Sequence, residues 1–449
     1  MNFLPNTDRD RAEMCRTCGV GSVEELFAPL PAEVRLRRPL DLPEPLSEME
    51  LAAHLQALAR RNAGTGEILS FLGAGAYEHY LPAAVGRLAG RAEFYTAYTP
   101  YQPEVSQGTL EAIYEYQSYV AALTGLDVAN ASLYDGATAV AEAAAMALNQ
   151  TRRTEFLIGE NVHPEYRAVL RTYARQWGAT VREVEAPDGV LDPGRVAAEV
   201  SAETAAVIVQ NPNFFGLVEA GEDLGAAAHA QGALYIVVAN PVSLGLLEAP
   251  GAYGADLCVG EGQPLGNPLG FGGPYVGFMA ARENLVRRMP GRIVGATVDR
   301  DGRRGFVLTL QTREQHIRRE KATSNICSNE ALCALAFTIH LSLLGPEGLR
   351  ELAELCLQKA HYAAERLGAL PGFGLVFAGP FFHEFVVRTP GPAEKLVERL
   401  AGRGILPGLP LGRFYPEFAN ALLVCVTETK SRADLDRLAE ALAEEAKRA

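Results

Sequence analysis

The segment from Glu93 to Gly108, EFYTAYTPYQPEVSQG, holds the densest set of residues in the chain that could take part in chemistry. It contains Tyr95, Tyr98 and Tyr101, two prolines, and several hydroxyl and amide groups just before a helical pattern. Proline restricts the backbone, and tyrosine combines a large apolar ring with a polar tip. This pattern predicts either a rigid loop that lines a pocket or an interface, or an ordinary packed loop.

A second unusual segment, residues 257–274, runs from an apolar stretch into a loop rich in glycine and proline. Glycine allows a ligand or another chain to approach the backbone closely. The loop lacks the G-x-G-x-x-G spacing before a helix, so a dinucleotide site is not supported.

Two further segments could bind an anion. Residues 135–138, Asp-Gly-Ala-Thr, stand at the start of an expected helix, where a phosphate is favoured. Asp135 would repel a phosphate there, so a helix cap is the preferred interpretation. Residues 313–325 concentrate basic charge, which fits a solvated helix face or a patch that meets a carboxylate or phosphate.

Lysine is scarce and unevenly placed. The chain has five lysines, and none precedes Lys321. Lysine chemistry is therefore excluded from the first 320 residues. Cys15 and Cys18 have C-x-x-C spacing, but no second pair follows nearby, so a metal or redox role is disfavoured.

The composition bounds the partners. A net charge of −13 makes nucleic acid and anionic membranes poor partners. The N-terminus is polar, and no apolar run looks long enough to span a bilayer, so we expect a cytoplasmic protein.

The hydrophobic pattern predicts an α/β protein. Capping boxes at Ser22/Glu25 and Ser47/Glu50 predict helices in an N-terminal arm, residues 1–66. Strands and helices then alternate, which predicts a mostly parallel sheet covered by helices on both faces, residues 67–328. A long helix and a short α/β pattern predict a small C-terminal domain, residues 329–449.

Four segments, residues 70–82, 95–108, 291–299 and 318–327, resemble in this order the P-protein family of the glycine cleavage system. The resemblance covers the whole chain. The length of the chain matches only the N-terminal half of the single-chain members of the family, as in organisms where the enzyme is split into two chains. It implies the aspartate-aminotransferase-like fold (fold type I) of pyridoxal-phosphate (PLP) enzymes.

The resemblance also implies that this chain lacks the cofactor's lysine. Aligning Gly272-Gly273-Pro274 with the cofactor-bearing half places Gln263 at the Schiff-base position, and glutamine cannot form an imine. Residues 237–241 carry no aspartate for the pyridine nitrogen. PLP would then be bound by a sister chain, glycine dehydrogenase subunit 2, in a heterodimer or a dimer of heterodimers.

In this interpretation the chain lends residues to the sister's pocket, where glycine loses CO2 and its aminomethyl group passes to the lipoyl group of H-protein. Tyr95 and Tyr98 would line that pocket, and Glu104 would serve as an acid, base or polar group. Further binding candidates are Tyr101, Gln102, Ser106, Gln107, Arg292, Lys321, Ser324 and Asn325. The alternatives are a stand-alone PLP enzyme using Lys321 and a purely structural or regulatory subunit.

Overall fold

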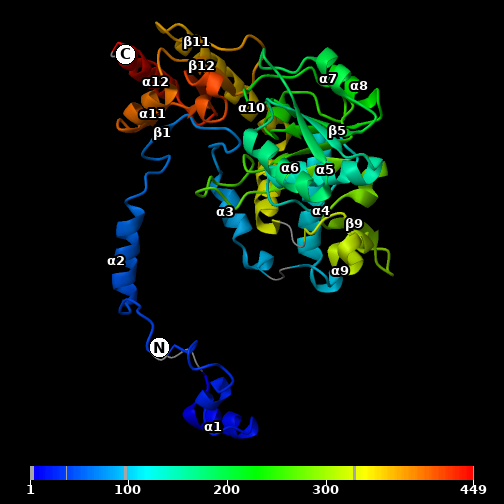
Figure 1. The fold of residues 1–449 in the computed structure, drawn as a ribbon, viewed down its shortest axis with the longest axis vertical. Coiled ribbons are helices and arrows are strands. Elements are labelled where there is room, and N and C mark those ends of the chain that lie inside the picture. Colours follow the sequence, from blue (N-terminus) through cyan, green and yellow to red (C-terminus); the bar gives the residue numbers. More distant parts are fainter. Residues whose placement is uncertain (1–4, 37, 96–98, 327–329, 448–449) are drawn as a thin grey trace. The chain divides into compact units, whose positions relative to one another are not determined.

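The computed structural model describes residues 5–36, 38–95, 99–326 and 330–447. The chain divides into two units, Met1–Ala63 and Gly64–Ala449 (Figure 1).

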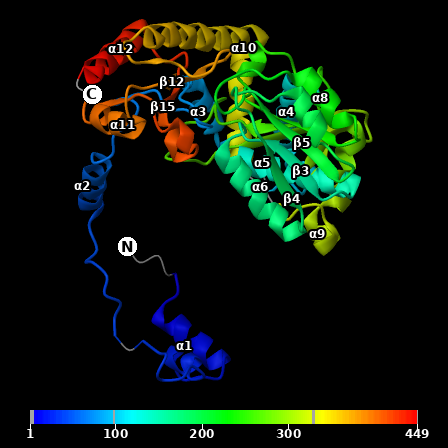
Figure 2. The same ribbon diagram turned by 45° about the horizontal axis from the view of Figure 1, so that its top comes forward.

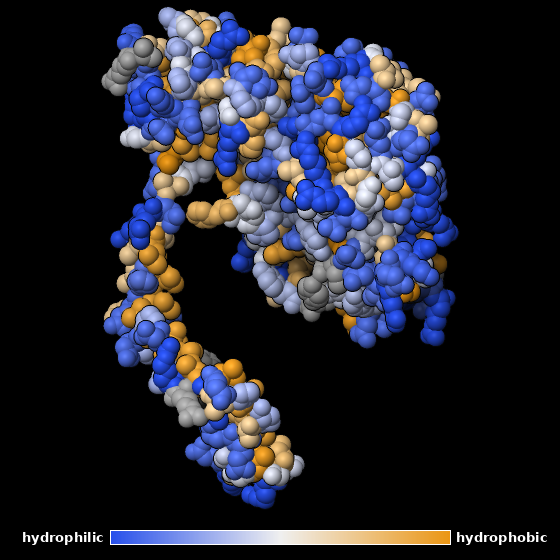
Figure 3. All heavy atoms as spheres, in the orientation of Figure 1, coloured by the Kyte–Doolittle hydropathy of each residue, from blue (hydrophilic) through white to orange (hydrophobic). Residues whose placement is uncertain are grey.

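The first unit contains two helices, α1 (Asp8–Thr17) and α2 (Glu48–Ala59), with a 3-10 turn between them, η1 (Val23–Phe27). The capping box predicted at Ser47 and Glu50 is confirmed at the start of α2. The box predicted at Ser22 is wrong, because the Glu25 carboxylate accepts from Gly21 N at 3.0 Å and Ser22 makes no side-chain cap. Many apolar side chains of this unit are exposed (Figure 3).

The cysteines of the C-x-x-C pair carry free thiols. Cys15 is buried, and Cys18 ends α1, where its N–H donates to the carbonyl of Met14. These contacts are those of ordinary helix residues.

The second unit is built on a seven-stranded sheet in the order β2-β8-β7-β6-β5-β3-β4. Strands β3 to β7 run parallel, and β8 and β2 are antiparallel to their neighbours. The predicted mostly parallel sheet is confirmed. The strand bounds are β2 (Val128–Ala129), β3 (Glu155–Gly159), β4 (Thr180–Val184), β5 (Thr204–Asn211), β6 (Leu234–Ala239), β7 (Leu257–Glu261) and β8 (Gly277–Ala281).

Helices cover both faces of this sheet because successive strand residues point to opposite sides. On β5, Ala206 and Ile208 pack under α5 and α6, whereas Val207 and Val209 pack under α7 and α8. Helices α4 and α10 (Ala331–Gly368) cover the part of the sheet that includes β7 and β8 (Figure 2). The bounds of the other helices that cover the two faces are α4 (Gln107–Thr124), α5 (Gly136–Thr151), α6 (Pro164–Trp177), α7 (Pro193–Glu199) and α8 (Gly221–His229).

Helix α10 (Ala331–Gly368) contributes to two cores and bends at Gly345, whose backbone is not helical, just before Pro346. Its first part packs with α4 against the large sheet, and its last part packs on a second sheet of order β11-β12-β15-β14. This sheet is antiparallel throughout. The elements are β11 (Gly374–Leu375), β12 (Glu384–Arg388), β14 (Leu409–Pro410), β15 (Ala421–Cys425), α11 (Ala393–Ala401) and α12 (Arg432–Ala446).

Within the described ranges, α10 alone is long and apolar enough, by length and composition, to cross a membrane. Most of its apolar residues between Cys333 and Leu367 pack into the two cores just described, although Leu343 and Leu355 are exposed, and this is the behaviour of a core helix.

The smaller elements connect these layers. A hairpin of β9 (Ile293–Val298) and β10 (Arg304–Thr309) packs on α4, and β1 (Leu69–Ser70) pairs in parallel with β13 (Ile405–Leu406). The two remaining α-helices of the described residues are short: α3 (Ala83–Ala89) and α9 (Gln315–Arg318). The domain boundaries at residues 66 and 328 stay predictions.

Candidate functional site

The carboxyl ends of β3, β5, β6 and β7 meet at one edge of the large sheet, where an open α/β sheet usually binds its ligand. A cavity of about 30 Å³ lies at this edge. Its lining residues are Gly75, Tyr77, His163, Tyr166, Gln210, Val238, Ala239, Asn240 and Glu261. A space of this size suits roughly one water molecule.

Gln263, two positions after the end of β7, is buried and contacts Tyr77, which lines this cavity. Its side-chain Nε2 donates to the carbonyls of Tyr77 (2.9 Å) and Asn267 (3.0 Å). Its Oε1 accepts from the N–H of Tyr77 at 2.9 Å. Every polar atom of this buried amide is thus paired with the backbone of Tyr77 or Asn267.

Two carboxylates occupy the N-terminus of α5, where a phosphate would be favoured. Glu261 accepts the N–H groups of Gly136 (3.0 Å), Gln263 (2.9 Å) and Val276 (3.1 Å). Asp135 accepts the N–H of Thr138 at 2.7 Å, so the predicted helix cap is confirmed. Burial raises the pKa of Glu261 to about 7, although its three backbone hydrogen bonds oppose the shift.

The position after β6 carries an amide and no acid. Asn240 Oδ1 accepts from the N–H of Val242 at 2.9 Å, and Asn240 Nδ2 lies 3.4 Å from His383 Nε2. On the other side of the cavity, the His163 ring stacks on Tyr166 at 4.6 Å, and its Nε2 lies 2.8 Å from the carbonyl of Ala74. The aromatic faces here pack on each other.

Glu384 closes this region from the small sheet. Its carboxylate accepts from the N–H of Ala74 (2.7 Å) and from the hydroxyl of Tyr77 (2.8 Å). Complete burial raises the pKa of Glu384 to about 7.

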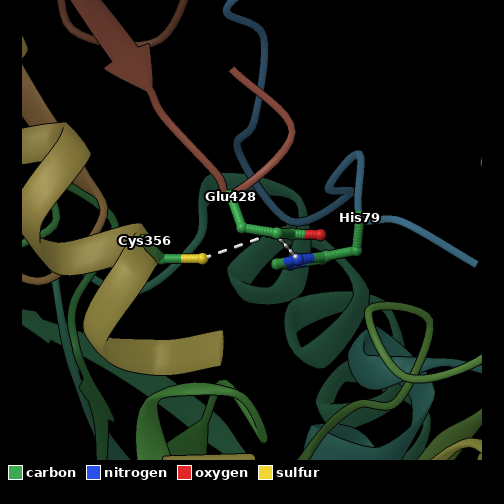
Figure 4. A group of neighbouring side chains, drawn as sticks. All are labelled: His79, Cys356 and Glu428. Atoms are coloured by element: carbon green, nitrogen blue, oxygen red, sulfur yellow. Dashed lines mark hydrogen bonds and ion pairs between the residues drawn. The ribbon is translucent and has the colours of Figure 1, made fainter. Parts of the chain in front are cut away.

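One group among the described residues has the composition of a metal site: His79, Cys356 and Glu428, whose ligand atoms lie within 4.8 Å of one another (Figure 4). Glu428 Oε2 already lies 2.7 Å from His79 Nδ1 and accepts from the Cys356 thiol at 3.5 Å. Burial raises the pKa of Cys356 well above its usual range, which opposes the thiolate that a metal requires. The three side chains form a hydrogen-bonded group that connects α10 to loops after β1 and β15.

The structure places the tyrosine loop at the surface. Tyr95 is 71% exposed, and Gln102 and Glu104 are also exposed. Tyr98 lies outside the described residues. Ser106 is buried at the start of α4.

Gln107 holds this loop on the hairpin. Its Nε2 donates to the carbonyls of Pro103 (2.7 Å) and Phe306 (2.9 Å), and its Oε1 accepts from the N–H of Phe306 at 2.8 Å. The loop is therefore fixed to β10, while Tyr95, Tyr101 and Glu104 are exposed.

Tyr101 brings two sequence-predicted segments together. The Arg292 guanidinium lies 5.6 Å over its ring and donates to its hydroxyl at 3.3 Å, and the His316 ring meets its edge at 6.2 Å. Arg292 is 3% exposed and lies 4.0 Å from the Glu314 carboxylate. The tyrosine loop and the basic segment thus share one contact network.

The remaining candidates lie elsewhere. Lys321 and Asn325 are exposed, whereas the Ser324 hydroxyl donates to the buried Glu142 of α5 at 2.7 Å. Sequence reasoning did not find Glu142, although its signal was a lone carboxylate in the apolar run AVAEAAAMA.

The fold is that of the aspartate-aminotransferase-like PLP enzymes. A solved C-DES mutant with glycine covalently linked to its PLP cofactor has a TM-score of 0.59 at 16% identity and covers 81% of this chain and 94% of that one. This likeness shows the fold alone.

The chain belongs to the glycine cleavage system P-protein family, whose model matches residues 1–442. It is 57% identical over 444 residues to the probable glycine dehydrogenase (decarboxylating) subunit 1 of Desulfitobacterium hafniense, covering 99% of this chain and 100% of the relative. A crystal structure of glycine decarboxylase (P-protein) of the glycine cleavage system, in inhibitor-bound form, is 48% identical with a TM-score of 0.91, covering 99% and 100% of the two chains.

Proposed function

We propose that this chain is subunit 1 of a heteromeric glycine dehydrogenase (decarboxylating) and that PLP is held by its sister, subunit 2. Together they decarboxylate glycine and transfer the aminomethyl group to the lipoyl group of H-protein. Membership in the P-protein family and the full-length match to relatives named subunit 1 support the role as one part of this enzyme.

The main support for placing PLP on the sister subunit is that this chain's own side chains occupy the sheet edge where the cofactor would bind. Gln263 replaces the lysine with a fully paired amide, and Glu261 occupies the N-terminus of α5. A cavity of about 30 Å³ does not admit a pyridine ring with its phosphate. The residues present do not fit the cofactor.

The exposed loops support a role at the sister's pocket. In this fold the active site lies between two subunits, so residues that act on the sister must face outward. Tyr95, Gln102 and Glu104 do so, and Phe271 at the tip of the glycine-rich loop is 93% exposed. A large exposed aromatic residue is typical of an interface.

We assign different tasks to the candidates. Tyr95, Tyr98 and Glu104 would face the glycine and lipoyl groups, and Tyr101 would be held in place by Arg292. Ser106 and Gln107 would set the loop on α4 and β10. Lys321 and Asn325 would contact the sister from the basic segment, and Ser324 would fix that segment to Glu142.

A stand-alone PLP enzyme using Lys321 is not favoured. Lys321 lies in the short turn η7 (Arg319–Lys321), whereas the cofactor edge is formed by β3 to β7. A purely structural subunit would assemble in the same way, and only activity separates it from this proposal.

The test is glycine–bicarbonate exchange with lipoylated H-protein and PLP-loaded sister subunit, with and without this chain. We expect exchange only when both subunits are present, and loss of exchange in loop variants that still assemble. Full exchange by the sister alone would contradict the proposal.

A further inference from the structure

A large pocket lies between α5, α6 and residues 320–326. Its volume is about 620 Å³, within the range of small-molecule sites. Helix α5 contributes Glu142 and Asn149, α6 contributes Tyr173 and Trp177, and the covering segment contributes Ser324.

Glu142 is the buried charged group of this pocket. It is 8% exposed, and one carboxylate oxygen accepts from the Ser324 hydroxyl at 2.7 Å. Its other oxygen is fully buried, and no described residue donates to it. An unpartnered buried carboxylate oxygen is costly, so a donor from outside the chain would be strongly favoured.

The other residues that line the pocket suit a ligand with a positively charged hydrogen-bond donor and an apolar part. No described lysine or arginine lines the pocket, and Glu320 adds a second carboxylate at its rim. Tyr134, Tyr173 and Trp177 provide aromatic faces, which attract ammonium and guanidinium groups. A divalent metal would need about six oxygen ligands, and Glu142 offers one free buried oxygen.

We propose that this pocket binds an organic cation, whose alkylguanidinium or alkylammonium head pairs with Glu142 and whose stem lies against Tyr173 and Trp177. The cation is either a free small molecule or an arginine or lysine side chain of another protein chain. Both sources present the same group to the same carboxylate. Burial raises the pKa of Glu142 to about 7, so in mildly alkaline solution the carboxylate is ionised and able to form a charged pair.

Trp177 makes the pocket directly observable, because it is the chain's only tryptophan. The probe is n-butylguanidinium, and the matched control is n-butylurea, which has a similar shape and no charge. Tryptophan emission of the full-length chain is followed during titration in mildly alkaline buffer. We expect a saturable change with n-butylguanidinium and none with n-butylurea over the same range.

The decisive variant is Glu142→Gln, which keeps a partner for Ser324 and removes the charge. We expect it to weaken n-butylguanidinium binding at least about tenfold. Glu203→Gln removes an exposed carboxylate elsewhere and should bind the probe as the wild-type chain does. Urea unfolding of both variants verifies that they are folded.

Adding the sister subunit separates the two sources. If an arginine or lysine of the sister fills the pocket, assembly should displace the probe and should be weakened by Glu142→Gln. If the cation is a free molecule, the assembled complex should bind the probe as the chain alone does, measured by calorimetry. Equal binding of the two probes, equal affinity in Glu142→Gln, or no binding by the chain together with normal assembly of Glu142→Gln would overturn the proposal.

Discussion

The polar side chains at the edge of the large sheet are buried, whereas those of the tyrosine loop are exposed. At the sheet edge, the side chains of Gln263 and Glu261 form hydrogen bonds with the backbone of this chain. In the loop, Tyr95 and Glu104 project outward with their ring or carboxyl exposed. The sheet edge is thus part of the core, whereas the loop carries an exposed hydroxyl and an exposed carboxyl group, as the proposed contact with a sister subunit requires.

The largest expected effect tests the structural role of the sheet edge. Gln263→Ala should lower the free energy of unfolding by about 3 to 9 kcal/mol, because three backbone groups lose their partners, at about 1 to 3 kcal/mol each. Gln102→Ala, at an exposed position, should change it by less than about 0.5 kcal/mol. Urea unfolding measures both, and similar small changes would show that the edge is not held by Gln263.

A second prediction concerns pH and Glu142. Its folded-state pKa of about 7 lies above the usual 4.5, so the folded chain keeps a proton that the unfolded chain releases between these values. Stability from this group is therefore present below pH 4.5 and lost as pH rises to about 7. Glu142→Gln does not titrate and should be more stable than the wild-type chain by about 3 kcal/mol above pH 7, with little difference below pH 4.5.

The measurement is urea unfolding of both chains at about pH 4 and about pH 8. Ser324→Ala serves as the control, because it removes the hydrogen bond and leaves the carboxyl group in place. A constant difference between Glu142→Gln and the wild-type chain across this range would contradict the assignment.

A third prediction tests the open surface. Tyr95→Phe and Tyr98→Phe should leave assembly and PLP content unchanged but reduce glycine–bicarbonate exchange about tenfold to a hundredfold, because a hydrogen bond to a reacting group is typically worth about 1 to 3 kcal/mol. Exchange is measured per bound PLP in each reconstituted complex. Tyr119→Phe removes a hydroxyl that lies 2.9 Å from Ser342 Oγ and should retain normal exchange. Normal exchange in both loop variants and in the double variant would remove the loop from the active site.

The smallest effect is expected at Tyr101. Tyr101→Phe removes the 3.3 Å hydrogen bond from Arg292 but keeps the ring under the guanidinium. We expect less than about a tenfold loss of exchange, since most of the contact survives. A loss larger than that of Tyr95→Phe would mean that the Tyr101 hydroxyl acts on the substrate itself.

Much of the fold follows from local patterns. The sequence pattern predicts helices over residues 164–177 and 393–401 and strands over residues 180–184, 234–239 and 384–388, and these bounds agree with α6, α11, β4, β6 and β12. Short apolar runs mark these strands, and helical spacing marks the two helices, which end at Gly178 and Gly402.

The β9–β10 hairpin was missed, because residues 293–309 alternate poorly and the first strand ends exposed. Its turn signal was Asp301-Gly302, and the Asp299 carboxylate fastens the turn by accepting the N–H groups of Asp301 and Arg303.

The candidate site also has features that the sequence predicts and features that it does not. That the sheet edge of this chain carries no lysine could be predicted, because the first 320 residues contain no lysine at all. The roles of Glu261 and Glu142 could not, because their partners lie 125 and 182 residues away along the chain. No local pattern reports such pairings, and only the folded sheet brings the groups together.

The most direct test of the central claim is to locate the cofactor. The complex of this chain with its sister, loaded with PLP, is reduced with borohydride, and the labelled lysine is identified by peptide mapping. We expect all label on the sister and none on this chain, including Lys321. Label on any lysine of this chain would contradict the claim that its cofactor region is filled by its own side chains.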